Sequence, residues 1–321
     1  MHQIHPLWRL LGIGLLALLA TSQAIAAPFA YITNQGANTV SVIDLAANQV
    51  VDTIVVSKGP AGVVVDGKHQ RVYVSNVDGR SVSVINTVTR KVVDEIKFDI
   101  APVGLALTHD GTQLYVADWY TDRIWVVNTK NTKKREAIAI GKAPASMVFN
   151  QQGDKLYVAN RDSDEVGIID AQTHKVLTKI AVGKHPFGMA LSGDGKSLYV
   201  VNVFSNNVSV IDTQNNAVIT KIRVGEHPYC ATSNPDGTRI YVTNTGADTI
   251  SVIDTVLQKV IATIDVGGSP EGINYDAVHD RVYVASWMDN QVTVVDAKTN
   301  LKVQSIPTGA QSRALGQFID Q

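Results

Sequence analysis

The sequence predicts an all-β fold, a seven-bladed β-propeller, from one repeat and from the way the chain ends. The tetrapeptide Tyr-Val-x-Asn, with close variants, recurs seven times at a constant spacing of 42 residues. A segment of the type Val-Ser-Val-Ile-Asp and a proline, replaced once by Ser312, keep the same register. The seven tyrosines are Tyr31, Tyr73, Tyr115, Tyr157, Tyr199, Tyr241 and Tyr283. Self-similarity at this period is typical of propeller blades.

Each repeat contains four short runs that favour β-strands. Alternating apolar residues and many β-branched side chains argue against helices here. In the fifth tyrosine repeat the expected strands are 187–191, 197–201, 207–211 and 217–224. The dipeptide Asp194-Gly195 indicates a tight hairpin between the first two strands. Asp212 ends the third, where a short side chain can accept bonds from turn amides. Four antiparallel strands per repeat make a propeller blade.

The two ends of the chain predict how the ring closes. The first repeat, which begins at Phe29, lacks an innermost strand of its own. Residues 312–319, after the last repeat, match an innermost strand in position and pattern. We therefore expect the C-terminal strand to complete the N-terminal blade, which removes both open sheet edges. A solenoid, the competing architecture, would need atypical capping repeats at its ends, and the sequence shows none.

The repeat signatures resemble those of a known family. Tyr-Val-x-Asn, Val-Ser-Val-Ile-Asp and a Val-Gly-x-x-Pro-x-Gly segment ahead of the blades are similar to the YVTN-repeat β-propellers, over essentially all of residues 28–319. The resemblance implies a seven-bladed propeller of the YncE-like periplasmic type. Related propellers include seven-bladed lactonases and haem d1-binding proteins, so the resemblance implies the fold strongly and function only by analogy.

The first 26 residues are predicted to be a signal peptide, which leaves residues 27–321 as the propeller. Arg9 supplies a positive charge, residues 10–20 are apolar and uncharged, and Ala24-Ile25-Ala26 offers small residues for cleavage. The apolar run is shorter than the roughly 20 residues that span a bilayer. We expect a mature periplasmic protein with no membrane span, and a monomer.

Composition and motifs exclude several classes of function. A formal net charge of -1 and a pI near 6.7 give no basic surface for nucleic acid. The hydrophobic fraction of 45% is enough for a substantial core. The sequence has no G-x-S-x-G, P-loop or H-E-x-x-H motif, and no C-x-x-C-H for covalent haem. No catalytic residue and no cofactor are therefore predicted.

The register also locates the positions at which blades differ. The loop leading into each proline and the loop after Tyr-Val-x-Asn share one rim of the disc, here called the proline rim. The Asp-Gly hairpins and the turns after Ile-Asp form the opposite face, the hairpin rim. Large polar or aromatic residues flank the proline in four consecutive blades and small ones in the other three. The candidate binding residues at the proline rim are His185, Phe187, His227, Tyr229, Glu271, Arg313, Trp119, Tyr120, Arg161, Phe204, Trp287 and Met288.

Glu271 and Arg313 occupy equivalent positions on adjacent blades, so a salt bridge across the mouth is expected. It would either order the rim or present Arg313 to a ligand carboxylate. The rim aromatics, among them Trp119 and Phe204, either stack on a ligand or partner or pack against one another. Both interpretations stay open from the sequence.

A metal site is a further alternative. His185 and His227 lie on adjacent blades ahead of prolines, which restrict their backbone. With Cys230 or Met288 they offer soft ligands suited to copper or zinc, although no short His/Cys spacing supports such a site. Cys230, the single cysteine, cannot form an internal disulfide and stands where most other blades have glycine, so packing is the favoured interpretation.

These features predict a non-enzymatic binding or interaction module that uses the proline rim. Its expected partner is a small molecule or a periplasmic or outer-membrane protein, and no nucleic acid. The alternatives are an enzyme or redox protein, such as a lactonase-like hydrolase or a metal- or haem-associated propeller, and a purely structural role.

Overall fold

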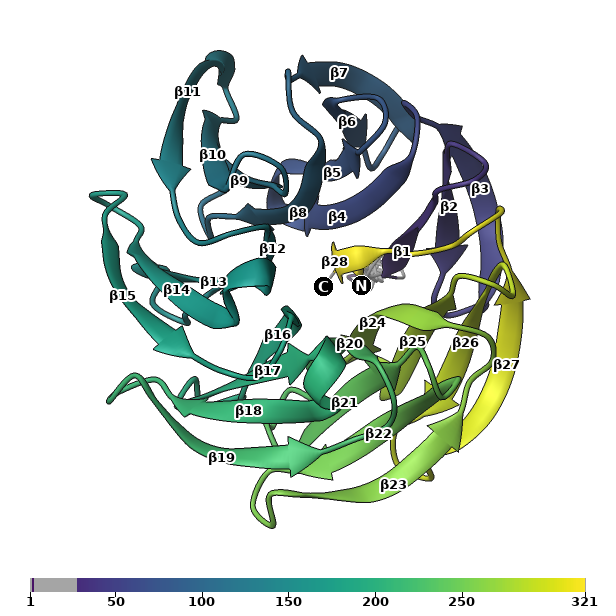
Figure 1. Cartoon of the computed structure of the whole chain (residues 1–321). Helices are drawn as coiled ribbons and strands as arrows, with labels where there is room; N and C mark the ends of the chain where they lie inside the picture. The colour runs from purple at the N-terminus through teal and green to yellow at the C-terminus, as the bar shows by residue number, and fades with distance from the viewer. Residues whose placement is uncertain (1, 3–27, 321) are drawn as a thin grey trace.

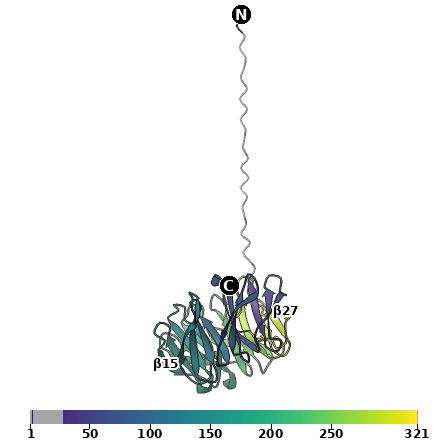
Figure 2. The same ribbon diagram turned by 90° about the horizontal axis from the view of Figure 1, so that it is seen from above.

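The computed structural model describes residue 2 and residues 28–320, and that part of the chain forms a ring of seven β-sheets around a central axis (Figure 1). Seen edge-on, the ring is a thick disc (Figure 2). The described residues contain 28 strands and three short 3-10 helices. The predicted signal peptide lies outside the described residues apart from His2. Within the described residues no helix is long and apolar enough to cross a membrane.

Every blade repeats the same antiparallel meander from the axis outward. The innermost strands are β4 (Pro60–Asp66), β8 (Pro102–Leu107), β12 (Pro144–Phe149), β16 (Pro186–Leu191), β20 (Pro228–Ser233) and β24 (Pro270–Asp276). The second strands are β1 (Phe29–Asn34), β5 (Arg71–Asn76), β9 (Gln113–Asp118), β13 (Lys155–Asn160), β17 (Ser197–Asn202), β21 (Arg239–Asn244) and β25 (Arg281–Ser286).

The third strands carry the Val-Ser-Val-Ile-Asp segment, and the fourth strands form the outer surface. The third strands are β2 (Thr39–Asp44), β6 (Ser81–Asn86), β10 (Arg123–Asn128), β14 (Glu165–Asp170), β18 (Asn207–Asp212), β22 (Thr249–Asp254) and β26 (Gln291–Asp296). The fourth strands are β3 (Gln49–Val55), β7 (Lys91–Lys97), β11 (Asn131–Ala139), β15 (Val176–Ala181), β19 (Ala217–Arg223), β23 (Lys259–Asp265) and β27 (Leu301–Pro307). The 3-10 helices are η1 (Gly67–His69), η2 (Arg161–Ser163) and η3 (Val203–Ser205).

The C-terminal segment closes the ring as predicted, with one addition. Its ends pair with β1 of the N-terminal blade, through antiparallel bridges from Asn34 to Ser312 and from Ala30 to Ile319. Between them, β28 (Leu315–Gln317) pairs in parallel with β4 of the second blade. The C-terminal segment therefore lies at the innermost position of the N-terminal blade and joins that blade to the second one.

The repeated residues are scaffold. All seven motif tyrosines are buried between blades, together with the β-branched residues of the second and third strands. The residue that ends each third strand accepts bonds from two turn amides in every blade, as Asp212 Oδ1 does from Gln214 and Asn215 at 2.8 Å. The hairpin glycines Gly195 and Gly237 have φ of 69° and 70°, which the predicted tight turns require. What differs between blades therefore lies at the two rims.

Candidate functional site

The loops of the proline rim are tied together in pairs. In six blades the amide of the residue after Tyr-Val-x-Asn donates to the carbonyl of the residue before the proline, as Val203 does to His185 at 3.1 Å. The predicted grouping of these two loops on one rim is therefore confirmed. Side chains from both loops point to the same end of the axis, and this brings most of the predicted residues together.

The backbone before the prolines differs from expectation. His185 and His227 have φ of 52° and 45°, the left-handed region, rather than the extended conformation that a following proline favours. An Asn or Asp 21 residues earlier explains this conformation, because its side chain accepts the amide of the residue before the proline. Asp164 holds His185 and Asn206 holds His227, both at 2.9 Å, and four other blades repeat the bond.

The residues after the prolines converge on the axis and close it. Phe187 stacks on Tyr229 with ring centroids 4.0 Å apart, and Trp119 meets Phe187 edge-on at 6.1 Å. The Arg161 guanidinium lies 5.3 Å from the centroid of the Trp119 ring, a cation–π contact. Opposite them, blades two to four supply the small buried residues Ala61, Val103 and Ala145.

The predicted salt bridge between Glu271 and Arg313 is present. Arg313 Nε donates to Glu271 Oε2 at 2.5 Å and Nη2 to Oε1 at 3.2 Å, a bidentate pair. Arg313 Nη1 also donates to Gln35 Oε1 at 3.2 Å, and Trp287 Nε1 donates to the same oxygen at 3.3 Å. Burial raises the pKa of Glu271, and the charge of Arg313 opposes that rise. These groups and the aromatic stack together form what we call the plug: Trp119, Arg161, Phe187, Tyr229, Glu271, Trp287 and Arg313.

Outside the plug lies a ring of exposed side chains. The second residue after each Tyr-Val-x-Asn motif is exposed in all seven blades. Three of these residues are large, Tyr120, Phe204 and Met288, at 76%, 58% and 67% exposure. Phe204 lies between the two histidines, with its ring centroid 4.3 Å from that of His185 and 5.9 Å from that of His227.

The structure does not assemble the alternative metal site. His185 and His227 each contact Phe204, while Cys230 is buried in the wall of the axial channel. Between residues 28 and 320 no group of three or more His, Cys, Asp or Glu side chains could hold a metal ion. Burial raises the pKa of the Cys230 thiol, which keeps it neutral. Its amide donates to Thr243 Oγ1 at 2.9 Å, consistent with the packing interpretation.

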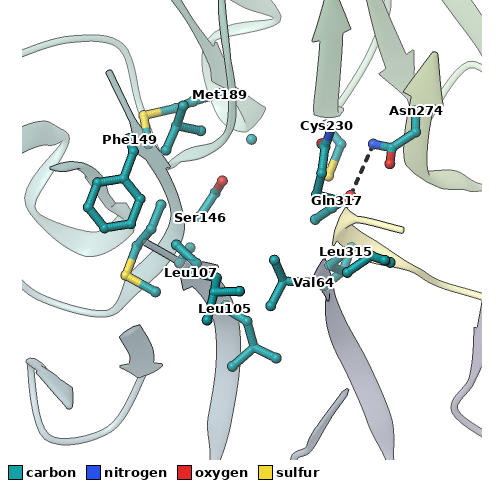
Figure 3. A pocket seen from close by; sticks show the side chains of 18 of the residues that line it. Val64, Leu105, Leu107, Ser146, Phe149, Met189, Cys230, Asn274, Leu315 and Gln317 are labelled. Carbon is teal, nitrogen blue, oxygen red and sulfur yellow. Dashed lines mark hydrogen bonds between the residues drawn. The ribbon is translucent and has the colours of Figure 1, made fainter. Parts of the chain in front are cut away.

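Sequence reasoning missed a cavity on the axis below the plug. It has a volume of about 550 Å³ and is lined by the innermost strands of six blades and by β28 (Figure 3). Its inner end touches Phe187 and Cys230, and its outer end reaches the hairpin rim at Lys68 and His109. The available signal was the run of Leu, Val and Met residues along the innermost strands, but a repeat comparison assigns such residues to the core.

Two family models match the chain. "YNCE-like beta-propeller" matches residues 189–281, and "Lactonase, 7-bladed beta-propeller" matches residues 28–182. A search of curated proteins gives no significant match.

Three solved structures share the fold at low identity. Hydrazine synthase of Kuenenia stuttgartiensis has a TM-score of 0.73 and 23% identity, covering 79% of this chain and 88% of its own. A functionally unknown protein of Desulfotomaculum acetoxidans has a TM-score of 0.76 and 12% identity, and the match covers 90% of this chain and 99% of that protein. Dihydro-heme d1 dehydrogenase NirN in complex with DHE has a TM-score of 0.70 and 14% identity, and the match covers 89% of this chain and 74% of that protein. These structures support the seven-bladed propeller fold, and the two family models that match, each over less than half of the chain, are those of YNCE-like and lactonase β-propellers.

Proposed function

We propose that the protein is an exported periplasmic binding module, without enzymatic activity of its own, that holds a partner protein on the proline rim. The observation that carries the proposal is the exposed outer ring. Tyr120, Phe204 and Met288 stand at one repeat position, where the other four blades carry glycine or aspartate. Exposed aromatic and methionine side chains are enriched at protein interfaces.

The plug favours a protein over a small molecule at this rim. Phe187 is almost fully buried, and the Glu271–Arg313 pair satisfies the charges that a small anionic ligand would need. The surface that stays available is the outer ring with His185 and His227. Such a surface suits a partner that lies across several loops. The plug beneath it supplies a rigid floor, because its members are fixed by stacking and hydrogen bonds.

Site-specific photo-crosslinking in the native periplasm tests the proposal. A photoreactive residue is placed at 120, 204 or 288, and in control proteins at Val88, Val256 or Val278, which are equally exposed away from this rim. We expect the three rim positions to capture the same protein and the controls not to capture it. Phe204→Ala should reduce capture from position 120 by about tenfold or more, as loss of an aromatic anchor does. Equal capture from both sets of positions would refute the proposal.

A further inference from the structure

The axial cavity is a second site, built from residues that the proline rim does not use. Its walls come from the innermost strands, including Leu105 and Leu107 of β8 and Met189 of β16, with Val64 of the neighbouring β4 and Leu315 of β28 (Figure 3). The wall residues Val64, Leu105 and Met189 are slightly exposed, at 7%, 5% and 5%, because their side chains border the cavity. A volume of about 550 Å³ lies within the range of ordinary ligand pockets.

Most of the side chains deep in the cavity are apolar, and Ser146 and Asn274 are among its polar wall groups. Asn274 is fully used: Nδ2 donates to Gly316 O at 3.0 Å, and Oδ1 accepts the amides of Phe318 and Ile319. Met147, Met189 and Phe149 offer polarisable, adaptable surface. Burial keeps Cys230 a neutral thiol. Such a lining binds an apolar body rather than a charged one, because a charge placed there would lose its hydration without gaining a partner.

The mouth of the cavity has a different character. Lys68 lines it, is exposed, and makes no ion pair with any residue that the structure describes. The one carboxylate in the lining, Asp66, is held by His69, whose Nδ1 lies 2.9 Å from both of its oxygens. His109 also lines the mouth, with its ring 6.1 Å from that of Phe149. The neighbouring carboxylates Asp110 and Asp320 are not part of the lining.

We propose that the axial cavity binds an amphipathic small molecule whose apolar chain enters the channel and whose anionic head group stays at the hairpin rim beside Lys68. The blind inner end at Phe187 sets the depth of the chain, and the unpaired ammonium sets the sign of the head group. This site is independent of the partner surface on the proline rim, which lies at the other end of the axis.

Calorimetric titration of the whole mature chain with straight-chain probes tests the proposal. We expect octanoate to bind at one site per chain, with a negative heat-capacity change from apolar burial. From hexanoate to decanoate the affinity should rise about fourfold per added methylene. Octylammonium should bind at least about tenfold more weakly than octanoate, because its charge meets Lys68. Absence of saturable octanoate binding, or equal affinity for octanoate, 1-octanol and octylammonium, would overturn the proposal.

Two blocking variants test whether the ligand binds in the cavity. Gln317 is an exposed lining residue on β28, so Gln317→Trp should fill the channel and lower octanoate affinity by more than about tenfold. Ser146→Phe, which projects from a second wall, is an independent block if the first variant unfolds. The control Gln172→Trp adds the same side chain at an exposed turn residue outside the lining and should bind as the wild type does. Unchanged binding in a folded blocking variant would contradict the proposal.

A charge reversal tests the head group separately. Lys68→Glu should weaken octanoate by about threefold to tenfold and leave 1-octanol unchanged, with the octanoate effect smaller at high salt. Lys130→Glu is the matched control, because Lys130 is also exposed in a turn of the hairpin rim but does not line the cavity. Phe204→Ala should leave octanoate binding intact. Loss of binding in Phe204→Ala rather than in Gln317→Trp would assign the ligand to the proline rim and overturn the cavity site.

Discussion

The two ends of the propeller axis are built by the same repeat, but side chains fill one end and leave a cavity at the other. At the proline rim, Phe187, Tyr229, Glu271 and Arg313 fill the space left by three small residues of the facing blades. At the hairpin rim the innermost strands end in turns around Lys68 and His109, and a cavity of about 550 Å³ stays open. The repeat fixes ring geometry, and the side chains at a few equivalent positions decide whether the axis holds a plug or a pocket.

The stabilities of the two ends should also differ. The plug contains a buried ion pair, stacked rings and shared hydrogen bonds, so losing one member leaves others unpaired. The cavity wall is apolar, and its side chains already border empty space. We therefore expect substitutions at the proline-rim end of the axis to affect folding and substitutions at the cavity mouth to affect binding.

The largest effect is expected from breaking the ion pair. Arg313→Met leaves the Glu271 carboxylate buried without its partner, which should cost about 4 kcal/mol of unfolding free energy. Arg313 and Glu271 are only 18% and 11% exposed, so water compensates little. Urea unfolding measures the loss. The double variant Glu271→Leu/Arg313→Met should recover most of it, because no charge is then buried. Equal loss in the single and double variants would show that packing, not charge, dominates.

The same pair predicts a pH dependence. Burial raises the pKa of Glu271 above its ordinary 4.5, so the folded state holds that proton more tightly than the unfolded chain does. The contribution of Glu271 to stability therefore falls as pH rises from about 4.5 through its raised folded pKa. In Arg313→Met no guanidinium opposes the effect of burial, so the pKa of Glu271 rises further and the pH dependence becomes larger. The stability gap between wild type and Arg313→Met should be larger at pH 8 than at pH 5, and a constant gap would contradict this account.

A smaller loss of unfolding free energy is expected when a side chain is added at the glycines where innermost strands approach one another. A Cβ on Gly104 would lie 1.8 Å from the Ala145 carbonyl oxygen, a contact that backbone must move to relieve. Gly104→Ala should cost about 2 kcal/mol in urea unfolding. Ser146→Ala is the control at the equivalent position of the next blade, which already carries a side chain. A loss of the same size in both variants would remove the close approach as the cause.

Much of the scaffold follows from sequence because it depends on local chemistry repeated seven times. All four strands of the fifth tyrosine repeat agree with expectation to within one residue at each end. Asp212 and its counterparts cap their turns as expected. The Glu271–Arg313 pair was also predictable, since a fixed register places equivalent residues of neighbouring blades side by side.

The remainder depends on contacts between blades, which a repeat comparison does not contain. The left-handed His185 requires Asp164, 21 residues away in the preceding blade. The parallel pairing of β28 with β4 arises because all innermost strands run from the proline rim to the hairpin rim, and these two are neighbours in the closed ring. The axial cavity depends on how far apart the innermost strands stand, and only the assembled ring sets that distance.

The smallest expected effect concerns the one blade in which no Asn or Asp side chain accepts the amide of the residue before the proline. Arg80 stands at the capping position with φ of 51°, and Ala101 before the next proline is not left-handed. Asparagine tolerates that region better than arginine, so Arg80→Asn should stabilise by about 0.5 kcal/mol. The reverse swap, Asn206→Arg, removes the bond to the His227 amide and should cost about 1 kcal/mol. Opposite signs in urea unfolding would show that the cap, rather than the proline, sets this backbone, whereas a loss in both variants would show that blade three is adapted to arginine.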